Sequence, residues 1–302
     1  MNGALDDRIA ASLTRDVRRE VTDFAAMLAE EAGAAAVLFY GSNLRTGSLD
    51  GVLDFYVLTP GPQRERVWPR VSYREWRLDG KVLRAKIATM SLAKFAEAAR
   101  GESRDTTIWS RFVQPSALAW AMDDKARRAV IGALCDAAVT ASRFAAALGP
   151  QSGRADEFWR ALFRATYQAE FRVEKPGREN DILSVNADHF EGLLPLAWEA
   201  QALPFTRSAD RLTPQVSAGE RRAILARWTS RQRLGKPLNI LRLAKATTTF
   251  EGAARYAAWK LERHTGIALE VTPFREKHPL LAMPGAAVDL WRARRKAARD
   301  QR

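Results

Sequence analysis

The stretch AAVLFYGSNLRTGSLDGVLDFYVLT, residues 35–59, decides how this chain is interpreted. One apolar run stops abruptly at Gly41-Ser42, and a second follows after a short polar segment. Each run is short and bounded by turn residues, which predicts two buried β-strands joined by a tight connection. Asp54 stands inside the second run, between Leu53 and Phe55, where a charge is unusual. The carboxylate and the Gly-Ser turn therefore require a chemical explanation.

The sequence around these two strands predicts an α+β unit. Apolar residues recur at helical spacing over residues 4–32, which predicts one amphipathic helix. An Asp-Gly turn and a third strand are expected within residues 77–90. Residues 91–100 begin with a serine cap and predict a helix. Together these elements predict a small mixed sheet with helices beside it.

After residue 116 the pattern is almost entirely helical. Residues 125–149 predict a long alanine-rich helix that ends at Gly149-Pro150. We expect an α+β fold in two parts, an α/β domain over residues 1–116 and a helical domain over residues 117–302. Further helices are expected over residues 156–174, 186–201, 218–233 and 249–264.

The composition restricts the class of protein. The 302 residues are 47% hydrophobic and carry a net charge of +13, which predicts a sizeable core and an anionic partner. The single cysteine, Cys135, excludes an internal disulfide, and three scattered histidines argue against a histidine-rich metal site. The longest apolar run, residues 34–40, is far too short to span a bilayer. No signal peptide is visible at the start, so we expect a cytoplasmic protein.

The positive charge is concentrated towards the C-terminus. Residues 221–260 contain ten Lys or Arg and one acid, and residues 288–302 contain six basic and two acidic residues. Trp228, Tyr256 and Trp259 interleave with these cations. Such a composition suits a helix lying on anionic lipid, and it also suits contact with a nucleic-acid backbone. The composition leaves both partners open.

The Gly-Ser turn has the chemistry of a phosphate site. A turn that follows a strand offers free backbone N–H groups and a hydroxyl, which suit a phosphate. Asp54 on the next strand would hold Mg²⁺ against the same phosphates, because Mg²⁺ prefers oxygen and usually takes one or two carboxylates. The residues expected to bind the nucleotide are Tyr40, Gly41, Ser42 and Asn43.

Other charged residues complete the expected site. The position two residues before Asp54 is Val52, so Asp50 is the nearest second acid and the other candidate Mg²⁺ ligand. Arg84 and Lys86 alternate with apolar residues on the third strand and are expected to face away from Leu83 and Ile87. A lysine there would offset the charge of a triphosphate.

Three stretches, in collinear order, carry a resemblance to a known family. They are FYGSNL followed by LDFYVL; VLRAKIATMSLAKFAEAA followed by WSRFVQPSALAWA; and LFRATYQAEFRVEKPGRENDILSVNADHF. The first resembles the nucleotidyltransferase signature of a Gly-Ser turn followed by acids on the next strand. All three, with the basic helical C-terminus, resemble the mitochondrial-type phosphatidate cytidylyltransferases, the translocator-assembly-and-maintenance family of CDP-diacylglycerol synthases.

The resemblance implies a reaction and its participants. It implies a Mg²⁺-dependent enzyme that joins CTP and phosphatidate into CDP-diacylglycerol and pyrophosphate, with a nucleotidyltransferase-like N-terminal domain. The enzyme would sit peripherally on the inner face of the membrane. The catalytic residues would be Asp54, Lys86 and Arg172, and the contacts to substrate phosphate would be Arg111, Glu170 and Asn186.

Two alternatives remain. A nucleotidyltransferase of the same fold could act on another acceptor, such as a small metabolite or RNA. A non-catalytic basic protein could bind nucleic acid and keep a degenerate nucleotide pocket, and the absence of an acid at Val52 favours this interpretation. The base of the nucleotide, the acceptor and the oligomeric state are not fixed by the sequence.

Overall fold

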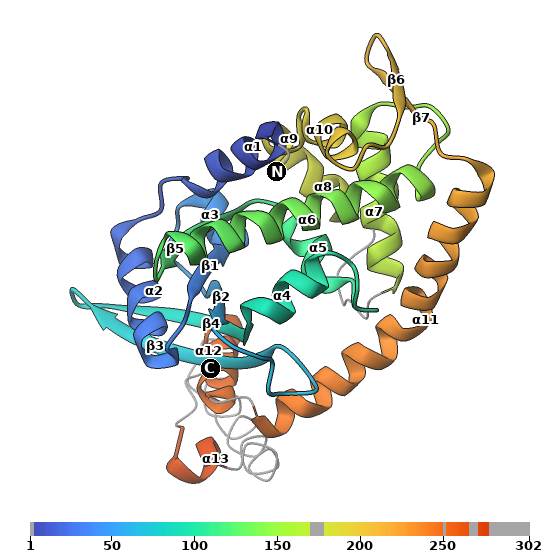
Figure 1. Cartoon of the computed structure of the whole chain (residues 1–302). Coiled ribbons are helices and arrows are strands. Elements are labelled where there is room, and N and C mark those ends of the chain that lie inside the picture. The colour runs from blue at the N-terminus through green and yellow to red at the C-terminus, as the bar shows by residue number, and fades with distance from the viewer. Residues whose placement is uncertain (1–2, 170–177, 250–251, 266–270, 278–302) are drawn as a thin grey trace, which may run out of the picture.

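A computed structural model describes residues 3–169, 178–249, 252–265 and 271–277 (Figure 1). Five strands form a mixed sheet in the order β3-β4-β2-β1-β5, in which only β2 and β4 run parallel. The strands are β1 Ala36–Tyr40, β2 Leu53–Thr59, β3 Arg70–Leu78, β4 Lys81–Ser91 and β5 Ser116–Ala121. The expected α+β fold with a small mixed sheet and a helical C-terminal region is confirmed.

The two strands of the opening stretch are confirmed, and two strands that the sequence did not reveal, β3 and β5, lie at the two edges of the sheet. The expectation that the chain is almost entirely helical after residue 116 was wrong for β5. The predicted third strand is β4, and its partner β3 precedes it across the turn at Asp79-Gly80. Most β3 residues are exposed or half-buried, and charged residues interrupt the apolar ones along the strand RVSYREWRL. An edge strand of this composition lacks the apolar periodicity by which strands are recognised.

The predicted helix over residues 4–32 is two helices, α1 Gly3–Leu13 and α2 Arg19–Ala32. The expectation of a single helix was wrong because its apolar residues serve two cores. Leu5, Ile9 and Leu13 pack into the larger core on one face of the sheet. Val21, Phe24 and Leu28 pack into the smaller core on the opposite face. One straight helix cannot reach both faces, so the chain breaks and passes around the edge at β5, which both helices contact.

The larger core lies between the sheet and a layer of helices centred on α6, Asp124–Leu148. Ser91 accepts a hydrogen bond from the Lys94 backbone N–H at 3.1 Å and caps α4, as predicted. Helix α6 is, in the described part of the chain, the one helix long and apolar enough to cross a membrane by length and composition, but 67% of its most apolar stretch is buried inside the protein. The layer comprises α4 Leu92–Ala99, α5 Thr107–Phe112, α6 Asp124–Leu148 and α7 Ala155–Ala169.

Shorter elements complete the helical side. Helix α10 packs on α6 and α1, while α8 packs on α7. The remaining elements are α3 Ser42–Thr46, α8 Arg178–Val185, α9 Ala187–Phe190, α10 Leu193–Ala200, the hairpin β6 Phe205–Ser208 and β7 Arg211–Pro214, and α13 Pro273–Lys277.

Helix α11, Ala218–Thr249, returns from the helical side to the sheet, and α12, Ala253–Thr265, follows it (Figure 1). The predicted end near residue 233 was wrong, because α11 continues past Pro237 while it packs on α6, α7 and β3. At Gly235 an added Cβ would lie 2.3 Å from the Ala169 carbonyl oxygen. Because Ala169 is the last residue of α7, the glycine allows α11 and α7 to approach closely.

Part of the basic segment 221–260 packs into the protein interior. Trp228 is only 5% exposed and its ring packs against Trp109 and Phe144. Arg231 is buried and donates hydrogen bonds to the carbonyl oxygens of Gly101 and Ser103. The expectation that Trp228 is available for a membrane or nucleic acid is thus wrong, because its ring belongs to the core. The basic tail over residues 288–302 lies outside the described residues.

The two-part organisation stays a prediction. Strand β5 starts at Ser116 and completes the sheet after the expected boundary. The larger core includes buried residues from both segments, such as Leu38 and Trp159. The two parts therefore share one apolar interior.

Candidate functional site

A row of polar side chains crosses the sheet at the position of Asp54. Tyr40 pairs with Asp54 between β1 and β2, Asp54 with Lys86 between β2 and β4, and Lys86 with Tyr73 between β4 and β3. Directly paired residues in a sheet project from the same face. Leu83 packs into the smaller core on the opposite face, as expected for a residue out of phase with Lys86. The sheet register thus brings Asp54 and Lys86 together.

The Gly41-Ser42 turn lies directly against the Asp54 carboxylate. Gly41 has φ +90° and ψ −163°, a conformation essentially restricted to glycine. A Cβ at this position would lie 3.0 Å from Asp54 Oδ2. Ser42 then begins α3 with its side chain exposed. The spatial association of turn and carboxylate, expected from the sequence, is present in the structure.

Asn43 has a structural task in the loop between β1 and β2. The side chain is only 8% exposed, and its amide nitrogen donates to the carbonyl oxygens of Ser48 at 2.8 Å and Asp50 at 2.9 Å. These bonds hold the loop in place beneath the turn. The structure therefore supports a positioning role for Asn43, while its direct contact with a nucleotide stays a prediction.

The charges around Asp54 are unevenly balanced. Burial raises the pKa of Asp54, and the nearby cations Lys86 and Arg111 oppose that rise. Lys86 is an exposed residue, yet the loss of water around its ammonium group lowers its pKa. Attraction to Asp54 opposes this change, and repulsion from Arg111 and Lys260 adds to it. Several cations thus surround one carboxylate, so this part of the site favours an additional anion.

Arg111 links the sheet to the helical layer. It lies on α5, and its guanidinium carbon is 5.4 Å from the centre of the Tyr40 ring, a cation–π arrangement. Burial raises the pKa of the Tyr40 phenol, so this group remains protonated at neutral pH. Arg111 also lines both hollows described below. The structure therefore places this predicted phosphate contact at the centre of the site.

A cleft of about 440 Å³ opens between the Gly-Ser turn and the helical side. Asp54 and Lys86 are not among the residues that line it, and Asp54 is connected to the cleft through its contact with Gly41. Five of the predicted residues line the cleft: Tyr40, Gly41, Ser42, Arg111 and Asn186. Glu170 and Arg172 lie outside the described residues. The other lining residues are Arg15, Leu44, Arg45, Gln114, Pro115, Tyr167, Asp181, Ile182 and Val185.

Two cleft arginines were not identified from the sequence. Arg45 lies in α3, immediately after the Gly-Ser turn, and this proximity was an available signal. Arg15 lies in the segment between α1 and α2. No local sequence pattern marks Arg15, because the tertiary packing of α1 determines where this residue lies. Both add positive charge to the side of the cleft.

The available ligands constrain a metal site. Among the described residues, no group of three or more Asp, Glu, His or Cys side chains is close enough to hold a metal. Asp50 is exposed, and its backbone carbonyl is engaged by Asn43. Asp54 alone fits Mg²⁺ only when phosphate oxygens and water supply the remaining ligands, which is the usual arrangement for this ion with nucleotides.

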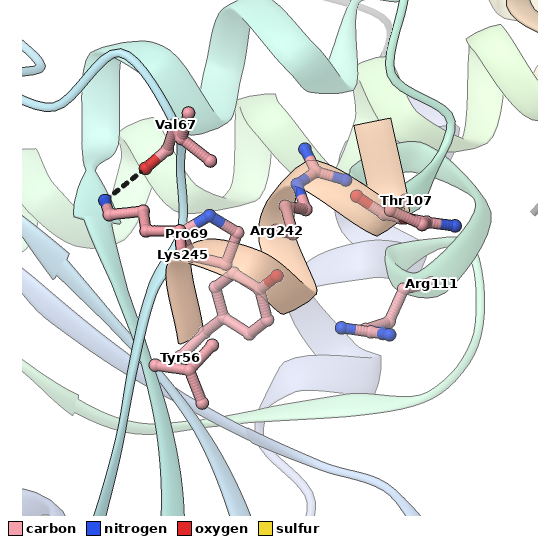
Figure 2. Close-up of a pocket in the computed structure, with 9 residues that line it drawn as sticks. Tyr56, Val67, Pro69, Thr107, Arg111, Arg242 and Lys245 are labelled. Atoms are coloured by element: carbon pink, nitrogen blue, oxygen red, sulfur yellow. Dashed lines mark hydrogen bonds between the residues drawn. The ribbon is translucent and has the colours of Figure 1, made fainter. Parts of the chain in front are cut away.

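A smaller pocket of about 170 Å³ lies on the other side of Arg111, beneath α11 (Figure 2). Figure 2 shows Arg111, Arg242 and Lys245 around the Tyr56 ring. Arg242 forms an ion pair with Asp105, and Lys245 bonds with Glu65 and the Val67 carbonyl oxygen. Internal carboxylates therefore offset two of the three cations that line this pocket.

No protein-family model and no curated protein matches the sequence. Among solved structures, the chain is similar to a nucleotidyltransferase-like protein from Exiguobacterium sibiricum 255-15. The two share 11% sequence identity over 89% of each chain, with a TM-score of 0.24. A likeness at this level carries no argument about fold or chemistry. The functional conclusion consequently depends on the geometry around Asp54.

Proposed function

We propose that this protein is a nucleotidyltransferase whose active site lies at Gly41, Ser42, Asp54 and Lys86. The observation that carries the proposal is the contact between a glycine turn and a carboxylate, with Lys86 beside the carboxylate on the neighbouring strand. Gly41 lets the backbone approach a phosphate closely, and Ser42 offers an exposed hydroxyl next to it. This arrangement suits the triphosphate of a nucleotide.

The proposed reaction is a displacement at phosphorus. An acceptor oxygen forms a bond to the α-phosphorus, the bond from that phosphorus to its bridging oxygen breaks, and pyrophosphate leaves with the bonding electrons. Lys86 and Arg111 offset the negative charge on the phosphoryl oxygens. Mg²⁺ held between Asp54 and the phosphates would supply further charge stabilisation.

The proposed substrates are CTP and phosphatidate, giving CDP-diacylglycerol and pyrophosphate. The three collinear stretches that resemble the phosphatidate cytidylyltransferases support this choice, and so does the net charge of +13, which suits an anionic acceptor. A lipid acceptor also implies peripheral binding to the inner face of the membrane. Tyr40 and Asn186 on the cleft wall would orient the nucleotide.

The direct test is turnover with defined substrates. The protein is incubated with Mg²⁺, vesicles containing phosphatidate, and each of the four nucleoside triphosphates in turn, and both pyrophosphate and the lipid product are measured. Pyrophosphate release that requires CTP and phosphatidate is the expected result. Asp54→Asn should reduce turnover by at least about a hundredfold, since one key electrostatic group typically contributes that much.

A matched variant shows whether any loss is specific. Asp124→Asn makes the same chemical change at an exposed carboxylate in the first turn of α6 and should leave turnover unchanged. Folded Asp54→Asn protein with normal turnover would remove Asp54 from the active site. Pyrophosphate release with another acceptor, such as RNA or a small hydroxyl compound, would support the proposed nucleotidyltransferase activity but would show that phosphatidate is not the acceptor.

A second candidate function follows from the single carboxylate. The described residues contain no cluster of metal-binding side chains, and Val52 occupies the position of a second acid. A protein of this kind could bind a nucleotide without transferring it. Tight binding of a triphosphate with no pyrophosphate release, under every acceptor tested, would support this non-catalytic function.

A further inference from the structure

Helix α12 packs on β3, the strand next to the one that carries Lys86. Tyr256 lies against Tyr73, with ring centroids 5.4 Å apart. At Gly252, just before the helix, an added Cβ would lie 2.6 Å from the Tyr73 carbonyl oxygen. Tyr73 is the residue paired with Lys86 across β3 and β4. The beginning of α12 is thus fixed beside the candidate site.

The other end of α12 reaches the loop before β2. Trp259 makes cation–π contacts with two arginines, with the guanidinium carbon of Arg84 5.5 Å and that of Arg263 5.4 Å from its ring centre. Arg263 also approaches Gly51, where a Cβ would lie 3.0 Å from its Nη1 atom. Helix α12 therefore extends from β3 towards the segment that leads into Asp54.

Lys260 lies between these two points of attachment. It follows Tyr256 by one helical turn, and its ammonium nitrogen is 6.0 Å from the Tyr256 ring centre. Tyr256 and Trp259, which flank Lys260 on α12, contact Tyr73 and Arg84, and both of these project from the same sheet face as Lys86. The charge of Lys260 also contributes to lowering the pKa of Lys86. Over the part of the chain that the structure describes, neither lysine forms a salt bridge. Two like charges held near each other repel, so a bound anion between them would be stabilising.

We propose that Lys260, together with Lys86, binds the terminal phosphates of the nucleoside triphosphate and the pyrophosphate that leaves. This inference rests on the proposed nucleotidyltransferase function and adds to it a residue from the C-terminal helix. Lysine is well suited to this role because its compact ammonium donates to phosphate oxygens without a fixed fork geometry. On this account α12 is a wall of the active site.

The test compares ligands that carry the terminal phosphates with one that lacks them. Calorimetry without metal measures the binding of inorganic pyrophosphate, CTP and CMP to the full chain. Lys260→Ala should weaken binding of pyrophosphate and CTP at least about tenfold, which corresponds to about 1.4 kcal/mol. Binding of CMP, which lacks the terminal phosphates, should be unchanged. Lys260→Arg keeps the charge and should retain most of the affinity.

The matched control is Arg255→Ala, which removes one positive charge from the same helix. Arg255 forms an ion pair with Glu276 of α13, away from the lysine pair. Normal pyrophosphate affinity is expected for this variant. Equal losses in Arg255→Ala and Lys260→Ala would show a general charge effect and overturn the inference.

Two further outcomes distinguish this inference from the function it rests on. If the wild-type protein binds CTP and pyrophosphate but Lys260→Ala binds them equally well, Lys260 has no such role and the proposed function stands. If the wild-type protein binds no nucleoside triphosphate and no pyrophosphate, the proposed function is wrong and this inference falls with it. Thermal melting of each variant confirms that the fold is retained.

Discussion

Gly41 is the residue at which conformation and chemistry meet. Its backbone adopts a region essentially closed to other residues, and Asp54 Oδ2 occupies the space a side chain would need. Gly41→Ala should therefore destabilise the turn by about 1–3 kcal/mol and weaken nucleotide binding. Urea unfolding and calorimetry measure the two effects.

Gly47→Ala provides the comparison for Gly41. Gly47 also has a positive φ, but no atom lies within 4 Å of an added Cβ. Its substitution should cost some stability through the backbone alone and leave nucleotide affinity unchanged. Equal nucleotide affinity in the wild-type protein, Gly41→Ala and Gly47→Ala would show that the nucleotide binds away from the Gly41 turn.

His189 makes stability depend on pH. Burial lowers its pKa to about 4 from 6.5, the hydrogen bond with the Val113 carbonyl oxygen opposes this, and Arg15 and Arg8 lower the pKa further. Between these two pH values the unfolded chain binds a proton that the folded chain does not. The free energy of unfolding should therefore fall as the pH decreases through this window.

His189→Gln tests the origin of this dependence. Glutamine can still donate a hydrogen bond to the Val113 carbonyl oxygen, but it does not titrate. Urea unfolding at several pH values should show a smaller change in this variant than in the wild-type protein. An identical pH dependence in both proteins would assign the effect to other groups.

The proximity of several candidate-site residues could be predicted from the sequence. Gly41, Ser42 and Asp54 were recognisable because two adjacent strands and their short connection keep them close in the chain. Lys86 followed from alternation along its strand. Lys260 could not be found in this way, since its proximity to Lys86 depends on the long return of α11 and the packing of α12 on β3.

At the scale of elements, the contact between α11 and α7 depends on one glycine. Gly235→Ala would place a Cβ 2.3 Å from the Ala169 carbonyl oxygen, so the helices must separate. We expect a loss of about 1–3 kcal/mol in the free energy of unfolding, as for other overpacked contacts. Gly219→Ala, in the first turn of the same helix, meets no atom within 4 Å and should be neutral or slightly stabilising. Thermal melting distinguishes the two, and equal melting temperatures would argue against close packing at Gly235.

The elements that were wrongly predicted share a cause. The break between α1 and α2 and the continuation of α11 past Pro237 both depend on which surfaces the helices cover. Local periodicity reports that a residue is apolar and in helical phase, and it does not report which core the residue enters. The buried strands β1 and β2 were predictable because their own composition marks them.

At the scale of the whole molecule, the net charge of +13 predicts binding to anionic membranes. Trp228 lies in the core, but two large apolar residues of α11, Ile240 and Leu241, are 58% and 50% exposed. Arg233 and Lys236 are also exposed on this helix. The protein should co-sediment with phosphatidate vesicles, and a part of this binding should resist salt because apolar burial is not screened.

Substitution of the two apolar residues tests that salt-resistant part. Ile240→Ser with Leu241→Ser should abolish it, whereas Met122→Ser, 56% exposed elsewhere on the surface, should not. Indifference to anionic vesicles, combined with RNA or DNA affinity that falls steeply with salt, would instead identify a nucleic-acid partner.

The larger core has a consequence for how the protein is made. Leu38, Tyr56, Leu58 and Met90 on the sheet are buried in a cluster completed by helices α6 and α7. A ribosome makes the sheet first, so this apolar surface is incompletely covered until those later helices emerge from the exit tunnel. The nascent chain should then depend on chaperones during this interval. A fragment of residues 1–116 expressed alone should accumulate as insoluble aggregates, and a soluble, cooperatively melting fragment would show that the first segment completes a core without them.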